Sequence, residues 1–264
     1  MRPLAELRDP QRIRGLLFDI DDTLTTNGKL TVEAYAGLGR LQRAGRILVA
    51  VTGRPAGWCD HIARMWPVDA VVGENGAFYF CLRQGKLHKR YHDLDDVRAL
   101  NRARLKTIGE RILRQVPGCA FASDQPYRET DLAIDYCEDV PPLPLEAAER
   151  ISALMRAEGL TAKVSSIHVN GWFGAYDKLA MTATLFVEQY MISADKLRRE
   201  FAFAGDSPND APMFSFFECS VGVANIARFA GSFTPEPTYV TRGAAGAGFA
   251  ELAAQLLAHL PESV

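Results

Sequence analysis

The sequence predicts an α/β protein in which a doubly wound, Rossmann-like parallel-sheet core is interrupted by an inserted α+β cap. Short apolar runs alternate with helix-like segments toward both ends of the chain, and the middle segment breaks this alternation with hairpin-like pairs of strands. Alternating strands and helices favour a parallel sheet joined by right-handed crossovers. We therefore expect a core formed by residues 1–78 and 174–264 and a cap formed by residues 79–173.

The amino-terminal part predicts three strands and two helices. Apolar runs at residues 13–18, 47–51 and 70–72 are typical of buried strands in a parallel sheet. Thr31 is expected to be the N-cap of the first helix, because apolar residues follow it at helical spacing. The second helix is expected over residues 57–65.

The middle segment predicts a hairpin followed by helices and short strands. A Gly-containing turn between two apolar runs indicates the hairpin, and Pro-Gly marks the end of a long polar helix. The expected elements are strands at 77–82 and 87–91, a helix at 94–115, strands at 119–122 and 131–136, a helix at 145–158 and a strand at 162–165.

The carboxyl-terminal part returns to the alternation of the first. The expected elements are helices at 179–188 and 194–199, a strand at 201–204, a helix at 213–217, strands at 220–223 and 238–240, and a helix at 249–260. The glycine-rich residues 243–248 are expected to form a flexible loop before the last helix.

Composition and charge narrow the class of protein. The 264 residues include 30 Lys plus Arg and 32 Asp plus Glu, for a net charge of −2, which argues against nucleic acid as a partner. No apolar run approaches the ~18 residues of a membrane span, and the amino terminus lacks the apolar region of a secretory signal. Five widely spaced cysteines are typical of buried thiols in a reducing compartment. We expect a cytoplasmic protein without a membrane partner.

Four polar clusters carry the candidate chemistry, and three of them directly follow a predicted buried strand. They are residues 19–25 (Asp-Ile-Asp-Asp-Thr-Leu-Thr), residues 52–54 (Thr-Gly-Arg), Lys178 and residues 205–210 (Gly-Asp-Ser-Pro-Asn-Asp). Ligands of open α/β sheets bind at the carboxyl ends of the strands. We therefore expect these clusters to converge in space although they lie far apart in the sequence.

The acidic clusters predict a site for Mg²⁺. Acids packed at a strand end repel one another unless a cation or a proton lies among them, and carboxylate and carbonyl oxygens are the ligands that Mg²⁺ prefers. Asp206 and Asp210 lie four residues apart, so that both can face one cation. The alternative for the first cluster is a solvated acidic turn in which Asp22 and Thr23 act as caps.

The residue types together fit a metal-assisted phosphatase. A carboxylate can attack phosphorus to form an acyl phosphate, and a second acid two residues along can protonate the leaving alkoxide and then deprotonate water. Asp19 and Asp21 fit these two tasks. Mg²⁺ and Lys178 would neutralise the anionic phosphoryl group, and the Thr52 hydroxyl can donate to one of its oxygens. Taken singly, the Thr-Gly-Arg segment is better explained by a plain N-cap at Thr52, and Lys178 by an exposed lysine.

These motifs resemble the haloacid dehalogenase-like phosphatases, and the inserted segment resembles their Cof-like (type IIB) branch. The Glu-Asn-Gly-Ala segment at residues 74–77 is similar to the Asn-Gly segment that precedes the cap in that branch. The resemblance implies that Asp19 is the nucleophile and Asp21 the general acid/base. It also implies that Thr52 and Lys178 bind the phosphoryl group.

The resemblance further implies a metal and a substrate site. Mg²⁺ would be held by Asp19, the Asp21 carbonyl and Asp206, with Asp210 or Asn209 in support. The residues expected to line the substrate site are Thr52, Gly53, Arg54, Asn75, His168, Asn170, Lys178 and Asn209.

The cap contributes less certain candidates. His168 alternates with Ser166 and Asn170, which predicts that these side chains share one strand face, either toward substrate or at a polar solvent-facing edge. Arg128 and its acidic neighbours Glu129 and Asp131 could also reach the cleft, but an exposed salt-bridge patch is the favoured expectation.

Three functions remain open from the sequence. The first is a Mg²⁺-dependent phosphatase acting on a small phosphorylated metabolite such as a sugar or polyol phosphate. The second is a phosphomutase, because Asp22 stands where many relatives have Gly, a feature similar to the sucrose-phosphatase and phosphomannomutase side of the branch. The third is a non-catalytic sugar-phosphate sensor, which would not need both Asp19 and Asp21.

Overall fold

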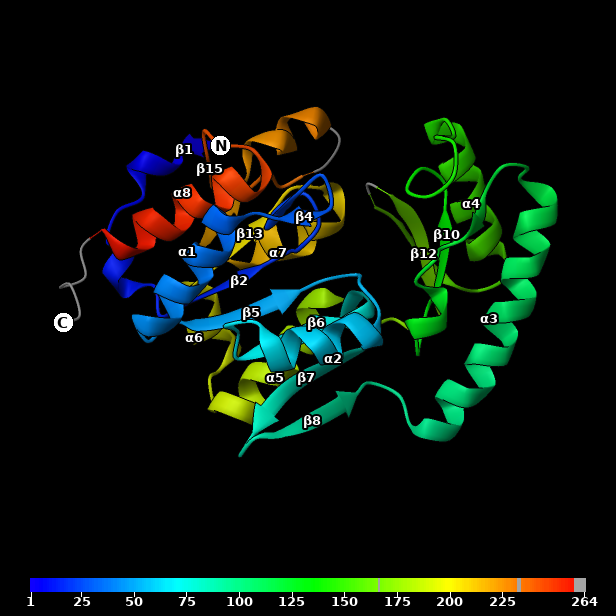
Figure 1. Cartoon of the computed structure of the whole chain (residues 1–264), viewed down its shortest axis with the longest axis horizontal. Coiled ribbons are helices and arrows are strands. Elements are labelled where there is room, and N and C mark those ends of the chain that lie inside the picture. Colours follow the sequence, from blue (N-terminus) through cyan, green and yellow to red (C-terminus); the bar gives the residue numbers. More distant parts are fainter. Residues whose placement is uncertain (166, 232–233, 259–264) are drawn as a thin grey trace.

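A nine-stranded β-sheet and a four-stranded β-sheet face each other (Figure 1). The computed structural model describes residues 1–165, 167–231 and 234–258. In spatial order the nine-stranded sheet contains β1 (Arg2–Pro3), β15 (Tyr239–Val240), β14 (Cys219–Gly222), β13 (Phe201–Gly205), β2 (Gly15–Phe18), β5 (Ile47–Val51), β6 (Ala70–Gly73), β7 (Phe78–Arg83) and β8 (Lys86–Tyr91).

In spatial order from β1 to β6 all neighbouring strands are parallel, whereas the β6–β7 and β7–β8 pairs are antiparallel. Its central strands are apolar because helices cover both faces. One face packs against α1 (Val32–Arg43), α2 (Ala56–Met65) and α8 (Ala245–Leu257), and the other against α5 (Lys178–Tyr190), α6 (Ala194–Glu200) and α7 (Ala211–Phe216). This doubly wound arrangement confirms the predicted fold class.

The order of the central strands positions the site. β2 lies between β13 and β5, and Phe18 at its carboxyl end is in register with Ala204 and Ala50 on the two neighbours. The polar clusters that follow these three strands therefore emerge at one edge of the sheet. A small hairpin of β3 (Thr25–Thr26) and β4 (Lys29–Leu30) follows the first cluster.

The smaller unit is an antiparallel sheet with two helices on its outer face (Figure 1). Its strands, in spatial order, are β11 (Thr161–Val164), β12 (His168–Trp172), β10 (Leu132–Asp135) and β9 (Ala120–Phe121). The helices α3 (Asp95–Gln115) and α4 (Leu145–Ala157) pack on this sheet around Ile134 and Val169. The opposite face of the sheet lies toward the carboxyl ends of the large sheet.

The hairpin of β7 and β8 lies in the large sheet rather than in the inserted unit. β7 pairs with β6 through Phe78, Tyr79 and Phe80, and these aromatic side chains are buried in the two cores of the large sheet. The expected boundary after residue 78 therefore falls inside this sheet, and the smaller unit begins after Tyr91.

The glycine-rich residues 243–248 do not form a loop, because α8 already begins at Ala245. A Cβ on Gly246 would lie 2.9 Å from the Leu24 carbonyl oxygen, and one on Gly248 would lie 2.3 Å from that of Gly243. The glycines thus allow the first turn of α8 to pack closely against the backbone at Leu24 and Gly243. Residues 259 and 260, expected to end this helix, lie outside the described residues.

None of the helices in the described ranges is long and apolar enough to cross a membrane.

Candidate active site

Lys178 joins two carboxylates at the carboxyl edge of the large sheet. Its Nζ lies 2.7 Å from Oδ1 of Asp19, which follows β2, and 2.8 Å from Oδ1 of Asp210, which precedes α7. Asp206, at the end of β13, completes a group in which the carboxylate oxygens of Asp19, Asp206 and Asp210 all lie within 4.8 Å of one another. The expected convergence of the first, third and fourth clusters is therefore observed.

The electrostatics of this group favour a cation. All four side chains are buried, and burial raises the pKa of Asp19 to about 8 although the charge of Lys178 opposes the shift. Burial, followed by the charges of Asp19 and Asp210, raises the pKa of Asp206 well above its ordinary value. Three carboxylates and one ammonium leave excess negative charge in a low-dielectric site. Closely spaced carboxylate oxygens of this kind fit Mg²⁺.

Neutral side chains orient Asp206. The Thr23 hydroxyl donates to Oδ1 at 3.4 Å, and the Asn225 amide donates to Oδ2 at 3.4 Å and to the carbonyl oxygen of Asp22 at 2.9 Å. The Asn225 carbonyl oxygen in turn accepts the N–H of Ala245 at the start of α8. No sequence pattern singles out Asn225, although it follows buried β14 at the same sheet edge.

Asp22 has a left-handed backbone with φ of 56°. Glycine is the residue that adopts this conformation most readily, and Asp tolerates it better than most side chains. Asp22 thus occupies a position where a glycine is sterically natural. Its charge also contributes to the raised pKa of Asp206.

Asp21 forms a two-pronged ion pair with Arg54. Arg54 Nε lies 3.1 and 3.0 Å from the two carboxylate oxygens, and Nη2 lies 2.8 Å from Oδ1. Arg54 also reaches the smaller unit through Glu138, whose second oxygen lies 2.8 Å from His168 Nε2. The sequence analysis missed Glu138, because its role depends on how the two sheets face each other.

Thr52, Gly53 and Asn75 lie together beside this ion pair. The Thr52 oxygen accepts the backbone N–H of Arg54 at 3.0 Å, which fixes the turn and leaves the hydroxyl hydrogen available for donation. A Cβ on Gly53 would lie 3.2 Å from Asn75 Oδ1, so the glycine gives this amide room. Asn75 Nδ2 is buried and has no hydrogen-bond partner among the described residues. An unused buried donor of this kind favours an anionic ligand.

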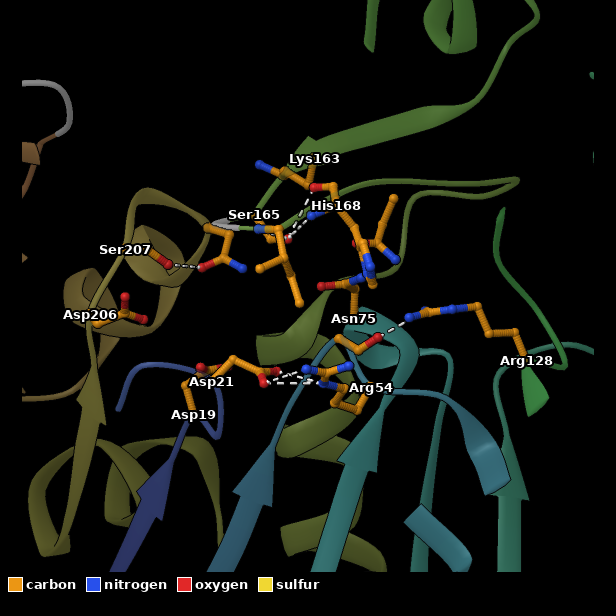
Figure 2. A pocket seen from close by; sticks show the side chains of 14 residues that line it. Asp19, Asp21, Arg54, Asn75, Arg128, Lys163, Ser165, His168, Asp206 and Ser207 are labelled. Atoms are coloured by element: carbon orange, nitrogen blue, oxygen red, sulfur yellow. Dashed lines mark hydrogen bonds and ion pairs between the residues drawn. The ribbon is translucent and has the colours of Figure 1, made fainter. Parts of the chain in front are cut away.

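His168 and Asn170 face the site from β12, in agreement with the predicted alternation. Ser166, predicted to share their face, lies outside the described residues. Lys163 and Ser165, which the sequence analysis did not single out, line the same cavity (Figure 2). Asn209 also lines it, and its side-chain oxygen accepts the Ser207 hydroxyl at 2.7 Å.

Arg128 does not belong to an exposed patch. It is buried, with Nε and Nη2 2.9 Å from the two oxygens of Asp124 and Nη1 3.0 Å from Asp131. Nη1 also donates to the Gly53 carbonyl oxygen at 2.9 Å, so this arginine connects the smaller unit to the large sheet. The expectation of a solvent-facing patch was wrong, because docking of the two sheets buries this segment.

A small cavity lies between the two sheets. Its volume is about 30 Å³, which is roughly the room that one or two water molecules need. Both units line the cavity. The unit of the large sheet contributes Asp19, Asp21, Gly53, Arg54, Asn75, Asp206, Ser207 and Asn209, and the smaller unit contributes Arg128, Lys163, Ser165, Ile167, His168 and Asn170.

Comparison with known protein families finds a match for part of the chain. Residues 16–106 match the model of a family described as haloacid dehalogenase-like hydrolase. No curated protein matches the sequence.

Solved structures with low sequence identity share the fold over nearly the whole chain. A protein of Thermoplasma acidophilum is 17% identical, with 92% of this chain and 98% of that chain covered and a TM-score of 0.70. A protein of Bacteroides thetaiotaomicron, described among the phosphatases of the haloalkanoate enzyme superfamily, is 20% identical, with 96% and 97% covered and a TM-score of 0.63. The sucrose-phosphatase of Synechocystis, solved with sucrose and phosphate, is 15% identical, with 92% and 98% covered and a TM-score of 0.61. Residues 16–106 therefore resemble the haloacid dehalogenase-like hydrolases, and the whole chain shares its fold with these solved structures.

Proposed function

We propose that the protein is a Mg²⁺-dependent phosphatase that hydrolyses a small phosphorylated metabolite, a sugar or polyol phosphate, through an aspartyl phosphate on Asp19. The observation that supports it most directly is the convergence of Asp19, Asp206, Asp210 and Lys178 at one sheet edge. In this proposal residues 1–91 and 174–264 form the catalytic core, and the smaller unit between them is the cap.

The residues have complementary tasks in the proposed reaction. Asp19 attacks phosphorus, while Lys178 and the donors of Thr52 and Asn75 balance charge on the phosphoryl oxygens. Asp21 gives its proton to the leaving oxygen, and its carboxylate then takes a proton from the water that attacks the aspartyl phosphate. Mg²⁺, held by Asp19, the Asp21 carbonyl and Asp206 with support from Asp210, would neutralise charge on the phosphoryl group.

The polar side chains of the cap favour the proposal of a polar substrate. Lys163, Ser165, His168 and Asn170 present charged and hydrogen-bonding groups to the cavity, and hydroxyl-rich metabolites offer matching donors and acceptors. The cavity volume of about 30 Å³ supports a cycle in which the cap opens to admit the substrate and closes to exclude water. The cytoplasmic location remains a prediction of the sequence.

Phosphate release from p-nitrophenyl phosphate and from a panel of sugar and polyol phosphates tests the proposal. We expect turnover with Mg²⁺, loss of turnover in excess EDTA and loss in Asp19→Asn, with the exposed Asp195→Asn variant as control. Turnover by Asp19→Asn at the wild-type rate would exclude Asp19 as the nucleophile. Conversion of a hexose 1-phosphate into its 6-phosphate without net phosphate release would instead establish a phosphomutase.

A further inference from the structure

The Arg54 guanidinium is held from both sides of the cavity. On the core side it pairs with both oxygens of Asp21 and lies 4.4 Å from the centre of the Trp58 ring. On the cap side Nη2 lies 3.1 Å from Glu138 and Nη1 lies 3.6 Å from Asp124. Arg54 is therefore the link between the proposed general acid/base and the cap.

Glu138 reaches Arg54 from a rigid loop. The buried carboxylate of Asp135, at the end of β10, accepts the backbone N–H groups of Cys137 at 2.9 Å, Glu138 at 2.8 Å and Asp139 at 2.8 Å. His168 on the neighbouring strand β12 lies 2.8 Å from the second oxygen of Glu138. The loop and His168 thus fix the position from which Glu138 contacts Arg54.

We propose that Glu138 is a positioning residue, which holds Arg54 in its ion pair with the Asp21 carboxylate when the cap is closed. Glu138 lies on the cap, whereas Arg54 and Asp21 lie on the core, so cap opening breaks this contact. Asp21 thus acquires its working orientation together with closure. The inference rests on the proposed phosphatase function and assigns a residue to its proton-transfer steps.

The contact serves both half-reactions. In the first, protonated Asp21 transfers its proton to the leaving oxygen as the bond from phosphorus to that oxygen breaks and the bond to Asp19 forms. Arg54 then stabilises the resulting Asp21 carboxylate through two parallel N–H donors. In the second, this carboxylate takes a proton from water while the water oxygen bonds to phosphorus and the bond between phosphorus and Asp19 breaks. Inorganic phosphate leaves, and the Asp19 carboxylate and protonated Asp21 are restored.

Leaving-group dependence separates positioning of Asp21 from a general structural role. The ratio kcat/KM reports the steps up to phosphoryl transfer, in which an alkoxide needs a proton donor and the weakly basic p-nitrophenolate does not. For Glu138→Gln we expect kcat/KM on glycerol phosphate to fall about tenfold, within the roughly 10²–10⁴-fold contribution of general acid catalysis. We expect kcat/KM on p-nitrophenyl phosphate to fall less than about threefold.

Asp139→Asn is the matched control, because this exposed neighbour lies on the same loop and the charge change is equal. Its kinetic constants should equal those of wild type on both substrates. An equal fall on both substrates for Glu138→Gln, with its melting temperature unchanged, would overturn the proposal, as would wild-type behaviour. The conservative Glu138→Asp variant should recover part of the glycerol phosphate activity only.

Arg54→Lys provides the second test, because lysine cannot bind Asp21 through two parallel donors. If Glu138 acts through Arg54, the double variant with Glu138→Gln should show no greater leaving-group dependence than Arg54→Lys alone. Additive effects would show that Glu138 acts independently of Arg54. Absence of phosphatase activity in the wild-type protein would instead refute the proposed function itself, so the two failures are distinguishable.

Discussion

Glu74, which follows β6 of the large sheet, binds the cap backbone at Thr130: its Oε2 accepts the Thr130 N–H at 2.6 Å and also contacts the Thr130 hydroxyl. Its Oε1 accepts the N–H groups of Glu129 and Ala56, both at 2.9 Å. One fully buried carboxylate therefore satisfies donors from both units. These contacts anchor the segment around Thr130 to the core, and we predict that this segment is the pivot of cap opening.

Glu74→Gln should weaken this attachment, because the amide replaces one accepting oxygen with an N–H₂ group that faces other donors. We expect the free energy of unfolding to fall by about 1–3 kcal/mol, the cost of leaving buried polar groups unsatisfied. Urea denaturation measures this, and hydrogen exchange should show faster exchange at Glu129 and Thr130. The exposed Glu149→Gln variant should change stability by less than about 0.5 kcal/mol. Unchanged exchange at these amides would contradict the pivot.

Mg²⁺ should stabilise the folded protein through Asp206. A ligand that binds only the folded state adds about 2.7 kcal/mol at about a hundred times its Kd, so the melting temperature should rise with Mg²⁺ concentration. Asp206→Asn removes one of the three clustered carboxylates and should abolish most of this rise, whereas Asp195→Asn should retain it. Potassium chloride at equal ionic strength controls for screening. An equal rise in Asp206→Asn would place the cation elsewhere.

Much of the fold follows from the sequence where elements are long and regular. Residues 47–51 form β5 as predicted, and the Thr31 side chain accepts the Ala34 N–H at 3.3 Å as the N-cap of α1. The two-residue strands β1 and β3 were missed, because pairing with other parts of the chain defines them. The expected cap includes residues 79–91 for a related reason: a hairpin pattern does not show which sheet the hairpin joins.

The part of the candidate site that lies at the carboxyl ends of neighbouring strands is predictable from the sequence. Asp19, Asp206 and Lys178 converge because β2 and β13 are neighbours and α5 begins beside them. Glu138 and Asn225 could not be predicted from the sequence. Their contacts with Arg54 and Asp206, respectively, form only when distant segments of the chain pack together. Single-sequence patterns therefore identify the chemistry of a sheet edge more readily than the contacts that an inserted unit adds to it.

Lys178→Met should show how far this lysine stabilises the acidic group. Removing one partner of a buried ion pair leaves charges uncompensated and costs about 3–5 kcal/mol. We expect the melting temperature of Lys178→Met in EDTA to fall well below that of the exposed control Lys196→Met. Mg²⁺ should recover part of the loss, whereas phosphatase activity should stay absent. If Lys178→Met in EDTA has the melting temperature of wild type, the Lys178 ammonium does not stabilise the clustered carboxylates.

Glu138 should make the stability of the protein depend on pH in the acidic range. The contact with His168, together with the charge of Arg54, lowers the pKa of Glu138 from its ordinary 4.5 to about 2 in the folded protein. A carboxyl whose pKa is lower in the folded state stabilises the protein above pH 4.5, and this contribution is lost as the pH falls from 4.5 toward 2.

The comparison of wild type with Glu138→Gln isolates this effect, because glutamine does not titrate. We expect the difference in free energy of unfolding to be constant between pH 6 and 7 and to shrink as the pH falls below about 4.5. Urea denaturation at a series of pH values measures it. His168→Gln should weaken the dependence, since it removes the larger of the two favourable contacts. A difference that stays constant down to pH 3.5 would show that neither contact stabilises the charged form of Glu138.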